Sequence, residues 1–137
     1  MTTKSIYYYT LTGKTEAALE LIDKDKVSIF KLNDINPKQL IFNECPVLII
    51  GSPTYGRGVP PSYFKEILPQ LKMIKGRKIG LFGSGNTIYG DDFCGALDVL
   101  EEVLSFKNNI TFKYKFEGYP RDVDLLNIKN LINEEAD

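Results

Sequence analysis

Short apolar runs alternate along this chain with amphipathic stretches. The runs predict strands over residues 5–9, 27–30, 46–50, 78–82 and 110–116. The run at 46–50 is apolar without interruption, as expected of a strand buried on both faces, whereas 110–116 alternates and predicts an edge strand exposed on one side. The stretches between the runs have apolar residues at helical spacing. They predict helices over 16–22, 60–71, 91–104 and 123–132.

This order of elements predicts a single α/β domain over residues 1–137. Strands separated by helices form a parallel sheet through right-handed crossovers, with helices on both faces. Five strands in this length favour the doubly wound order 2-1-3-4-5, in which ligands bind beyond the carboxyl ends of the strands, near strands 1 and 3. Residues 33–44 leave room for little more than one helical turn, so we expect a reduced second crossover.

Composition removes several classes of function. The sequence has no histidine, which excludes a Ser-His-Asp triad, a Cys-His pair and an imidazole general base. The net charge of −1 argues against a nucleic-acid partner, and no apolar run approaches the ~20 residues of a membrane span. The two cysteines fit a reducing, cytoplasmic setting and are not spaced as zinc ligands. We therefore expect the reactive group to come from a cofactor.

The loop after the first predicted strand is rich in hydroxyl groups. These groups can donate hydrogen bonds to an oxyanion, Gly13 allows close approach of the backbone, and the following helix adds unpaired N–H groups. The loop suits a phosphate, and an ordinary helix cap is an equally good interpretation. It lacks the spacing of a nucleoside-triphosphate loop. Its residues are Thr10, Leu11, Thr12, Gly13, Lys14 and Thr15.

The loops after the third and fourth predicted strands each contain a tyrosine, Tyr55 and Tyr89. A planar ligand could stack between the two rings, and the glycines and amides nearby could face a heteroaromatic edge. The alternative for the first loop is a tight turn into a helix that begins with proline. For Asp91 the alternative is a negative charge at a helix N-terminus. The candidates are Pro53, Thr54, Tyr55, Gly56, Arg57, Gly58, Ser84, Gly85, Asn86, Tyr89, Asp91 and Phe93.

Together, the three loops resemble those of the flavodoxin family. Residues 10–15 are similar to the T-x-T-G-x-T loop that binds the FMN phosphate, 51–56 resembles the loop that covers one flavin face, and 83–98 resembles the second flavin loop with its helix. The resemblance implies a flavodoxin-like three-layer sandwich that binds FMN. It also implies an electron carrier that cycles through three redox states of the flavin, without a substrate of its own.

The resemblance also implies roles for individual residues. Tyr55 and Tyr89 would flank the flavin ring, and the peptide of Gly56 would turn toward the flavin on reduction. The backbone of Gly85 and Asn86 would contact the pyrimidine edge. The phosphate would be held by Thr10, Thr12, Gly13, Lys14 and Thr15.

Two segments resemble a smaller group, the NrdI-type activators of class Ib (manganese) ribonucleotide reductase. Residues 112–123 look like the F-E-x-x-G-T-x-x-D-V ending of that group, and 84–91 resemble its S-G-N-x-x-x-G-D loop. This similarity implies a protein that supplies reduced oxygen species to the metal subunit of the reductase. A flavodoxin reductase-type protein would be the electron donor.

The alternative to an electron carrier is a protein of a different functional class, a flavin-free binding or signalling module with the same fold. A phosphorylated receiver domain is disfavoured, because the first strand ends in threonine where a receiver needs an acidic pair. We expect a monomer with neither a nucleic-acid nor a membrane partner. Cys94 is expected to be a buried residue on the apolar side of its helix.

Overall fold

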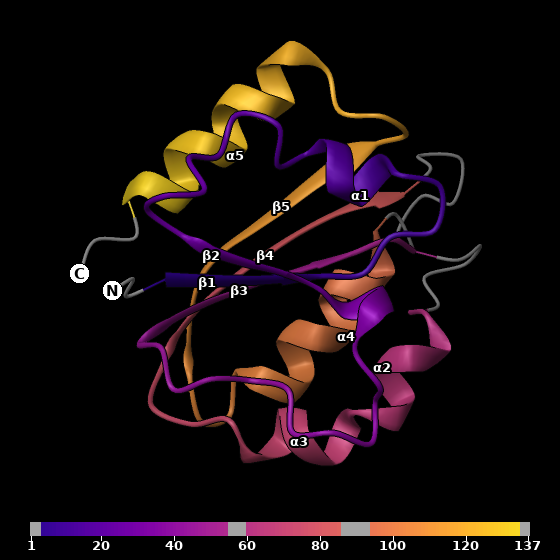
Figure 1. Cartoon of the computed structure of the whole chain (residues 1–137), viewed down its shortest axis with the longest axis vertical. Helices are drawn as coiled ribbons and strands as arrows, with labels where there is room; N and C mark the ends of the chain where they lie inside the picture. Colours follow the sequence, from indigo (N-terminus) through magenta and orange to yellow (C-terminus); the bar gives the residue numbers. More distant parts are fainter. Residues whose placement is uncertain (1–3, 55–59, 86–93, 135–137) are drawn as a thin grey trace.

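The computed structural model describes residues 4–54, 60–85 and 94–134. Its strands form one parallel sheet of order β2-β1-β3-β4-β5 (Figure 1), which confirms the predicted order. The strands are β1 (Lys4–Tyr8), β2 (Ser28–Lys31), β3 (Val47–Ser52), β4 (Lys78–Gly85) and β5 (Asn109–Glu117). The helices are α1 (Lys14–Ala17), the 3-10 helix η1 (Leu32–Asp34), α2 (Ser62–Glu66), α3 (Leu68–Met73), α4 (Gly95–Leu104) and α5 (Asp122–Glu134).

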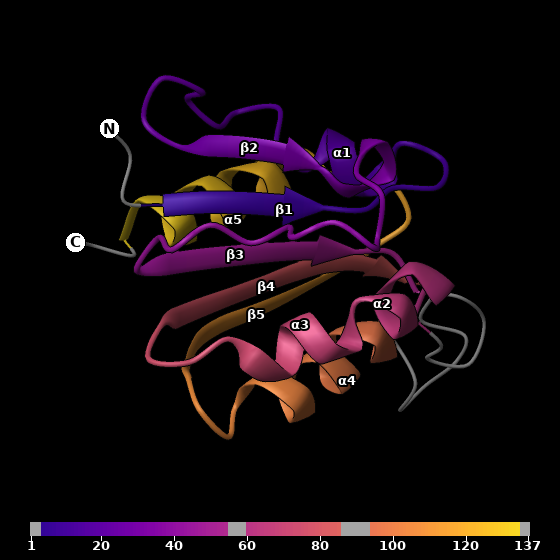
Figure 2. The same ribbon diagram turned by 60° about the horizontal axis from the view of Figure 1, so that its bottom comes forward.

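Helices cover both faces of the sheet, with α1 and α5 on one face and α2, α3 and α4 on the other (Figure 2). Side chains alternate between the two faces along a strand, so each central strand contributes to two cores. On β1, Tyr7 belongs to the core under α2, α3 and α4, whereas Ile6 and Tyr8 belong to the core under α1 and α5. All of β3 is buried. The uninterrupted apolar run at 46–50 therefore reflects burial on both faces.

The edge strand β5 is attached to α4 by a cluster of ion pairs. The Lys113 ammonium lies 2.6 Å from the Asp98 carboxylate and 2.9 Å from that of Glu101. Lys115 adds a third contact to Asp98 at 3.1 Å. Lys113 and Lys115 thus lie on a half-exposed side of the predicted edge strand and bind the neighbouring helix.

Two predicted helices are wrong in extent. α1 ends at Ala17, and the chain continues in turns closed by bonds between residues three apart, such as Ile22 N to Leu19 O at 3.1 Å. The predicted helix over 60–71 is divided at Ile67 into α2 and α3, because Pro69 has no N–H and fits only in the first turn of a helix. Among the described residues, no helix combines the length and the apolar composition needed to cross a membrane.

The reduced second crossover is confirmed. Between η1 and β3 the described chain forms no further helix, and side chains from α2 and α3 hold it in place. The Tyr63 hydroxyl donates to Ile35 O at 2.8 Å. The Gln70 amide accepts from Ile41 N at 3.0 Å and donates to Gln39 O at 2.7 Å. These bonds satisfy backbone groups that a helix would have paired internally.

Candidate functional site

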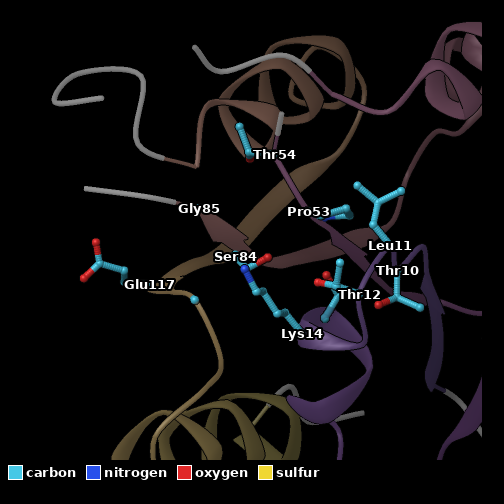
Figure 3. Close-up of a pocket in the computed structure, with 11 residues that line it drawn as sticks. Thr10, Leu11, Thr12, Lys14, Pro53, Thr54, Ser84, Gly85 and Glu117 are labelled. Carbon is cyan, nitrogen blue, oxygen red and sulfur yellow. The ribbon is translucent and has the colours of Figure 1, made fainter. Parts of the chain in front are cut away.

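A cavity of about 310 Å³ lies at the carboxyl ends of β1, β3, β4 and β5 (Figure 3). Segments far apart in the sequence form its walls, because the parallel topology brings the ends of these strands to one edge of the sheet. Its described lining consists of Thr10, Leu11, Thr12, Lys14, Thr15, Pro53, Thr54, Ser84, Gly85, Glu117 and Gly118. The first nine of these are candidates from the sequence, so the fold brings them together.

The other sequence candidates are placed differently. Gly13 is the N-cap of α1 and is outside the described lining of the cavity. Eight candidates fall outside the described residues: Tyr55, Gly56, Arg57, Gly58, Asn86, Tyr89, Asp91 and Phe93. The stacking of a planar ligand between the two tyrosines therefore stays a prediction.

The loop between β1 and α1 is held by its own first residue. The Thr10 hydroxyl accepts a hydrogen bond from Gly13 N at 3.0 Å, which leaves its own O–H proton free to donate to a ligand. Gly13 has a φ of +87°, a left-handed conformation that side chains with a Cβ rarely adopt. The glycine thus allows the chain to turn directly from the strand into α1.

Thr15 provides the strongest indication of a ligand. Its side chain is fully buried, and its hydroxyl oxygen Oγ1 has no hydrogen-bond partner among the described residues. An unpaired buried hydroxyl costs about 1–3 kcal/mol of stability. Because Thr15 lines the cavity, an oxygen atom of a ligand bound there would provide the missing partner.

Lys14 brings a positive charge from the hydroxyl-rich loop into the cavity. Figure 3 shows the Lys14 side chain extending past Thr12 toward Ser84, with Glu117 on the opposite side of the cavity. We expected the helix N-terminus to contribute to anion binding, but α1 has only four residues and too few aligned peptides for a strong macrodipole. The unpaired N–H groups of its first turn can still donate locally, so their role in holding an anion stays a prediction, beside that of the hydroxyls and Lys14.

Sequence reasoning missed the contribution of the ends of β2 and β5. The Asn33 side chain, just after β2, exchanges two hydrogen bonds with the backbone of Thr10. After β5, Gly118 N donates to Gly85 O at 3.1 Å, and the Tyr119 hydroxyl donates to Thr12 O at 2.7 Å. Both segments directly follow a strand. The rule that places the loops after parallel strands at one edge of the sheet therefore predicts that these segments also lie beside the cavity.

The loop residues also position α4. Thr54 Oγ1 accepts a hydrogen bond from Ala96 N at 3.3 Å in the first turn of α4. Cys94 is fully buried, as predicted, in the same core as Leu97 and Leu100, although it is the N-cap of α4 and not a residue of the helix. Burial raises the pKa of the Cys94 thiol to about 12. The thiol is thus protonated at neutral pH, which fits a structural residue.

A family model, a curated relative and a solved structure all relate this chain to flavodoxins. The chain matches the flavodoxin family model over residues 6–118. It is 36% identical over 104 residues to a probable flavodoxin 2 of Bacillus subtilis, a match that covers 70% of this chain and 68% of the relative. It aligns with oxidised flavodoxin 2 from Bacillus cereus at a TM-score of 0.79 and 26% identity, over 97% of this chain and 99% of the other.

Two further similarities are informative. A Fusobacterium nucleatum flavodoxin bound to flavin mononucleotide has the same fold, with a TM-score of 0.71 and 21% identity over 97% of this chain and 95% of that one. Protein NrdI of Yersinia pseudotuberculosis is 22% identical over 126 residues, which amounts to 90% of each chain.

Proposed function

Since this chain belongs to the flavodoxin family, we propose that it binds FMN in the cavity at the carboxyl edge of the sheet and carries electrons between redox proteins. When bound, FMN supplies the chemistry, because it accepts and releases one or two electrons. The observation that carries the proposal is the fully buried, unpartnered hydroxyl of Thr15 in the cavity wall. A phosphate oxygen provides the acceptor that this hydroxyl lacks.

The described residues divide the cavity into two parts. We assign the Thr10, Thr12 and Thr15 hydroxyls to a phosphate dianion, whose charge the Lys14 ammonium, extending toward Ser84, would balance. The other part is lined by Pro53, Thr54, Ser84 and Gly85, which would lie against the flavin ring. The tyrosines expected to flank the ring, Tyr55 and Tyr89, complete this proposed site.

The test is to purify the full chain, saturate it with FMN and record its visible spectrum after removal of free ligand. We expect the absorption bands of bound flavin, with FMN released in about equimolar amount on denaturation. A protein that remains colourless after saturation contradicts the proposal. That result would support the flavin-free binding module of the same fold.

A second, narrower function is supported by the extent of the similarity to NrdI. That match covers 90% of both chains, and residues 84–91 and 112–123 resemble segments of the NrdI-type activators. The second crossover is also reduced to the short η1 and a loop. We propose that the acceptor is the dimanganese subunit of a class Ib ribonucleotide reductase, that the donor is a flavodoxin reductase-type protein, and that the carrier acts as a monomer.

The FMN-loaded protein can be tested against two acceptors in parallel. One is the manganese-loaded reductase subunit in the presence of oxygen, and the other is cytochrome c, with the same flavodoxin reductase as donor in both assays. Activation of the reductase subunit, above that given by an unrelated flavodoxin at equal concentration, supports the narrower role. Reduction of cytochrome c without activation assigns the chain to general electron transfer. Size-exclusion chromatography with light scattering tests the monomer.

A further inference from the structure

The peptide unit that joins Thr12 to Gly13 is held at both of its ends. Its N–H group, on Gly13, donates to the Thr10 hydroxyl at 3.0 Å. Its carbonyl oxygen, on Thr12, accepts from the Tyr119 hydroxyl at 2.7 Å. The first bond is local, whereas the second crosses 107 residues of sequence. The orientation of this peptide, and with it the positions of Thr12 and Lys14 beside the cavity, thus depends on Tyr119.

The turn that presents Tyr119 is fixed at both ends. On one side, Gly118 N donates to Gly85 O at 3.1 Å, which attaches the end of β5 to the end of β4. On the other side, Arg121 N donates to the Asp124 carboxylate at 2.9 Å, at the start of α5. Gly118 has a φ of +60°, which turns the chain sharply out of the strand. Tyr119 therefore reaches Thr12 from a well-defined position.

The ring of Tyr119 has a second contact with the same loop. The Lys14 ammonium lies 5.9 Å from the centroid of the ring, within the range of a cation–π interaction. This contact restricts a long side chain that would otherwise sample many rotamers. Tyr119 thereby acts on the Lys14 ammonium through its ring and on the Thr12 carbonyl through its hydroxyl. Its own side chain remains 60% exposed, so the fold does not depend on its burial.

We propose that Tyr119 is a positioning residue that holds the Thr12–Lys14 segment in the geometry that binds a phosphate. The site would thereby select a flavin that carries a 5′-phosphate over the same flavin without it. This inference rests on the proposed function, since it assumes that the cavity binds FMN. The contacts of Tyr119 with the lining of the cavity are made to Thr12 and Lys14, which we assign to the phosphate. Its effect should therefore be confined to the phosphate.

The experiment measures the dissociation constants of FMN and riboflavin for the apoprotein by quenching of flavin fluorescence. Tyr119→Phe removes only the hydroxyl, and Tyr119→Leu also removes the ring beside Lys14. We expect the dissociation constant of FMN to rise about three- to tenfold in Tyr119→Phe, as for the loss of one hydrogen bond, and further in Tyr119→Leu. The riboflavin constant should stay within about twofold of the wild-type value. The urea midpoint of the apoprotein should be unchanged in Tyr119→Phe.

Tyr63→Phe is the matched control, because Tyr63 also donates to a backbone carbonyl, at 2.8 Å, and is outside the described lining of the cavity. It should leave the ratio of the two constants unchanged. The inference is overturned if neither Tyr119 variant changes the FMN constant, or if the FMN and riboflavin constants rise together. A wild-type protein that binds neither flavin overturns the proposed function itself.

Discussion

Asn33 and Thr10 form a pair of hydrogen bonds that joins the end of β2 to the loop after β1. The Asn33 side chain accepts from Thr10 N at 3.0 Å and donates to Thr10 O at 2.7 Å. The two residues are 23 positions apart in the sequence. Thr10 in turn accepts from Gly13 N through its hydroxyl, so the conformation of the proposed phosphate loop depends on a side chain outside that loop.

Replacement of Asn33 by alanine should loosen this loop. The change removes both bonds to Thr10, and we expect the apoprotein to lose about 1–2 kcal/mol of unfolding free energy in urea titrations. FMN should also bind several-fold more weakly. Asn36→Ala is the control, since the Asn36 side chain accepts an exposed local bond from Lys38 N at 2.9 Å. A variant at Asn33 that keeps both the stability and the affinity of the wild type would contradict a role in holding the loop.

Thr15 should affect the apoprotein and the FMN complex in opposite directions. Thr15→Val keeps the shape of the side chain and removes the buried, unpartnered hydroxyl. We expect the apoprotein to gain about 1 kcal/mol of stability in urea, because an unsatisfied polar group is lost. The affinity for FMN should fall by about tenfold or more, as expected when a hydrogen bond to a charged group is lost. Thr15→Ser, which retains the hydroxyl, should keep most of the affinity; equal FMN binding by the valine variant would argue against a bound phosphate.

A Cβ at position 13 should strain the backbone without causing a clash. Gly13 has a φ of +87°, and the nearest atom to an added Cβ would be the Tyr119 hydroxyl at 4.0 Å. Gly13→Ala should therefore destabilise the apoprotein by about 1–2 kcal/mol and also weaken FMN binding. Gly76→Ala is a matched control, since Gly76 has a φ of +70° and open space around it. Gly76→Ala should lower the melting temperature by a similar amount but leave the FMN affinity unchanged. If both variants weaken FMN binding, the effect of Gly13→Ala does not come from strain in the loop beside the cavity.

Asp124 should make the stability of the fold depend on pH. Burial alone would raise the pKa of its carboxyl, but hydrogen bonds from Arg121 N (2.9 Å) and the Tyr114 hydroxyl (2.8 Å) outweigh burial and lower it. A carboxyl whose pKa is lower in the folded state stabilises the fold above its unfolded pKa of about 3.9. This stability is lost as the pH falls through the folded value.

Asp124→Asn tests this linkage. At pH 7 we expect the variant to lose about 1.5–3 kcal/mol of unfolding free energy, because the hydrogen bonds to a charged acceptor are weakened. The difference from the wild type should begin to narrow below about pH 4, where the carboxyl of the unfolded chain becomes protonated, and should narrow further as the pH approaches the lower folded pKa. Denaturant titrations of both proteins from pH 3 to pH 7 measure this difference in unfolding free energy. Asp25→Asn, in an exposed turn, serves as the control. If the unfolding free energies of the wild type and Asp124→Asn differ by the same amount across this pH range, Asp124 acts through packing and not through its charge.

Part of the candidate site could be predicted, because parallel strands place their carboxyl ends at one edge. Once the order of strands was inferred from the alternation of elements, the loops after β1, β3 and β4 had to meet there. The length of α1 could not be predicted, because Ala18, Leu19 and Ile22 are buried in turns as well as they would be in a helix. Spacing of apolar residues alone does not distinguish the two conformations.

The sequence by itself determined the alternation of strands and helices, the burial of the run at 46–50 on both faces and the hydroxyl-rich loop, because periodicity and turn residues are local properties of the chain. Only the tertiary structure decided which side chains hold that loop. Asn33 and Tyr119 reach Thr10 and Thr12 across 23 and 107 residues, and no local pattern specifies a single hydrogen bond between distant segments. Such bonds are set by how the packed sheet and helices place the ends of β2 and β5 beside the end of β1.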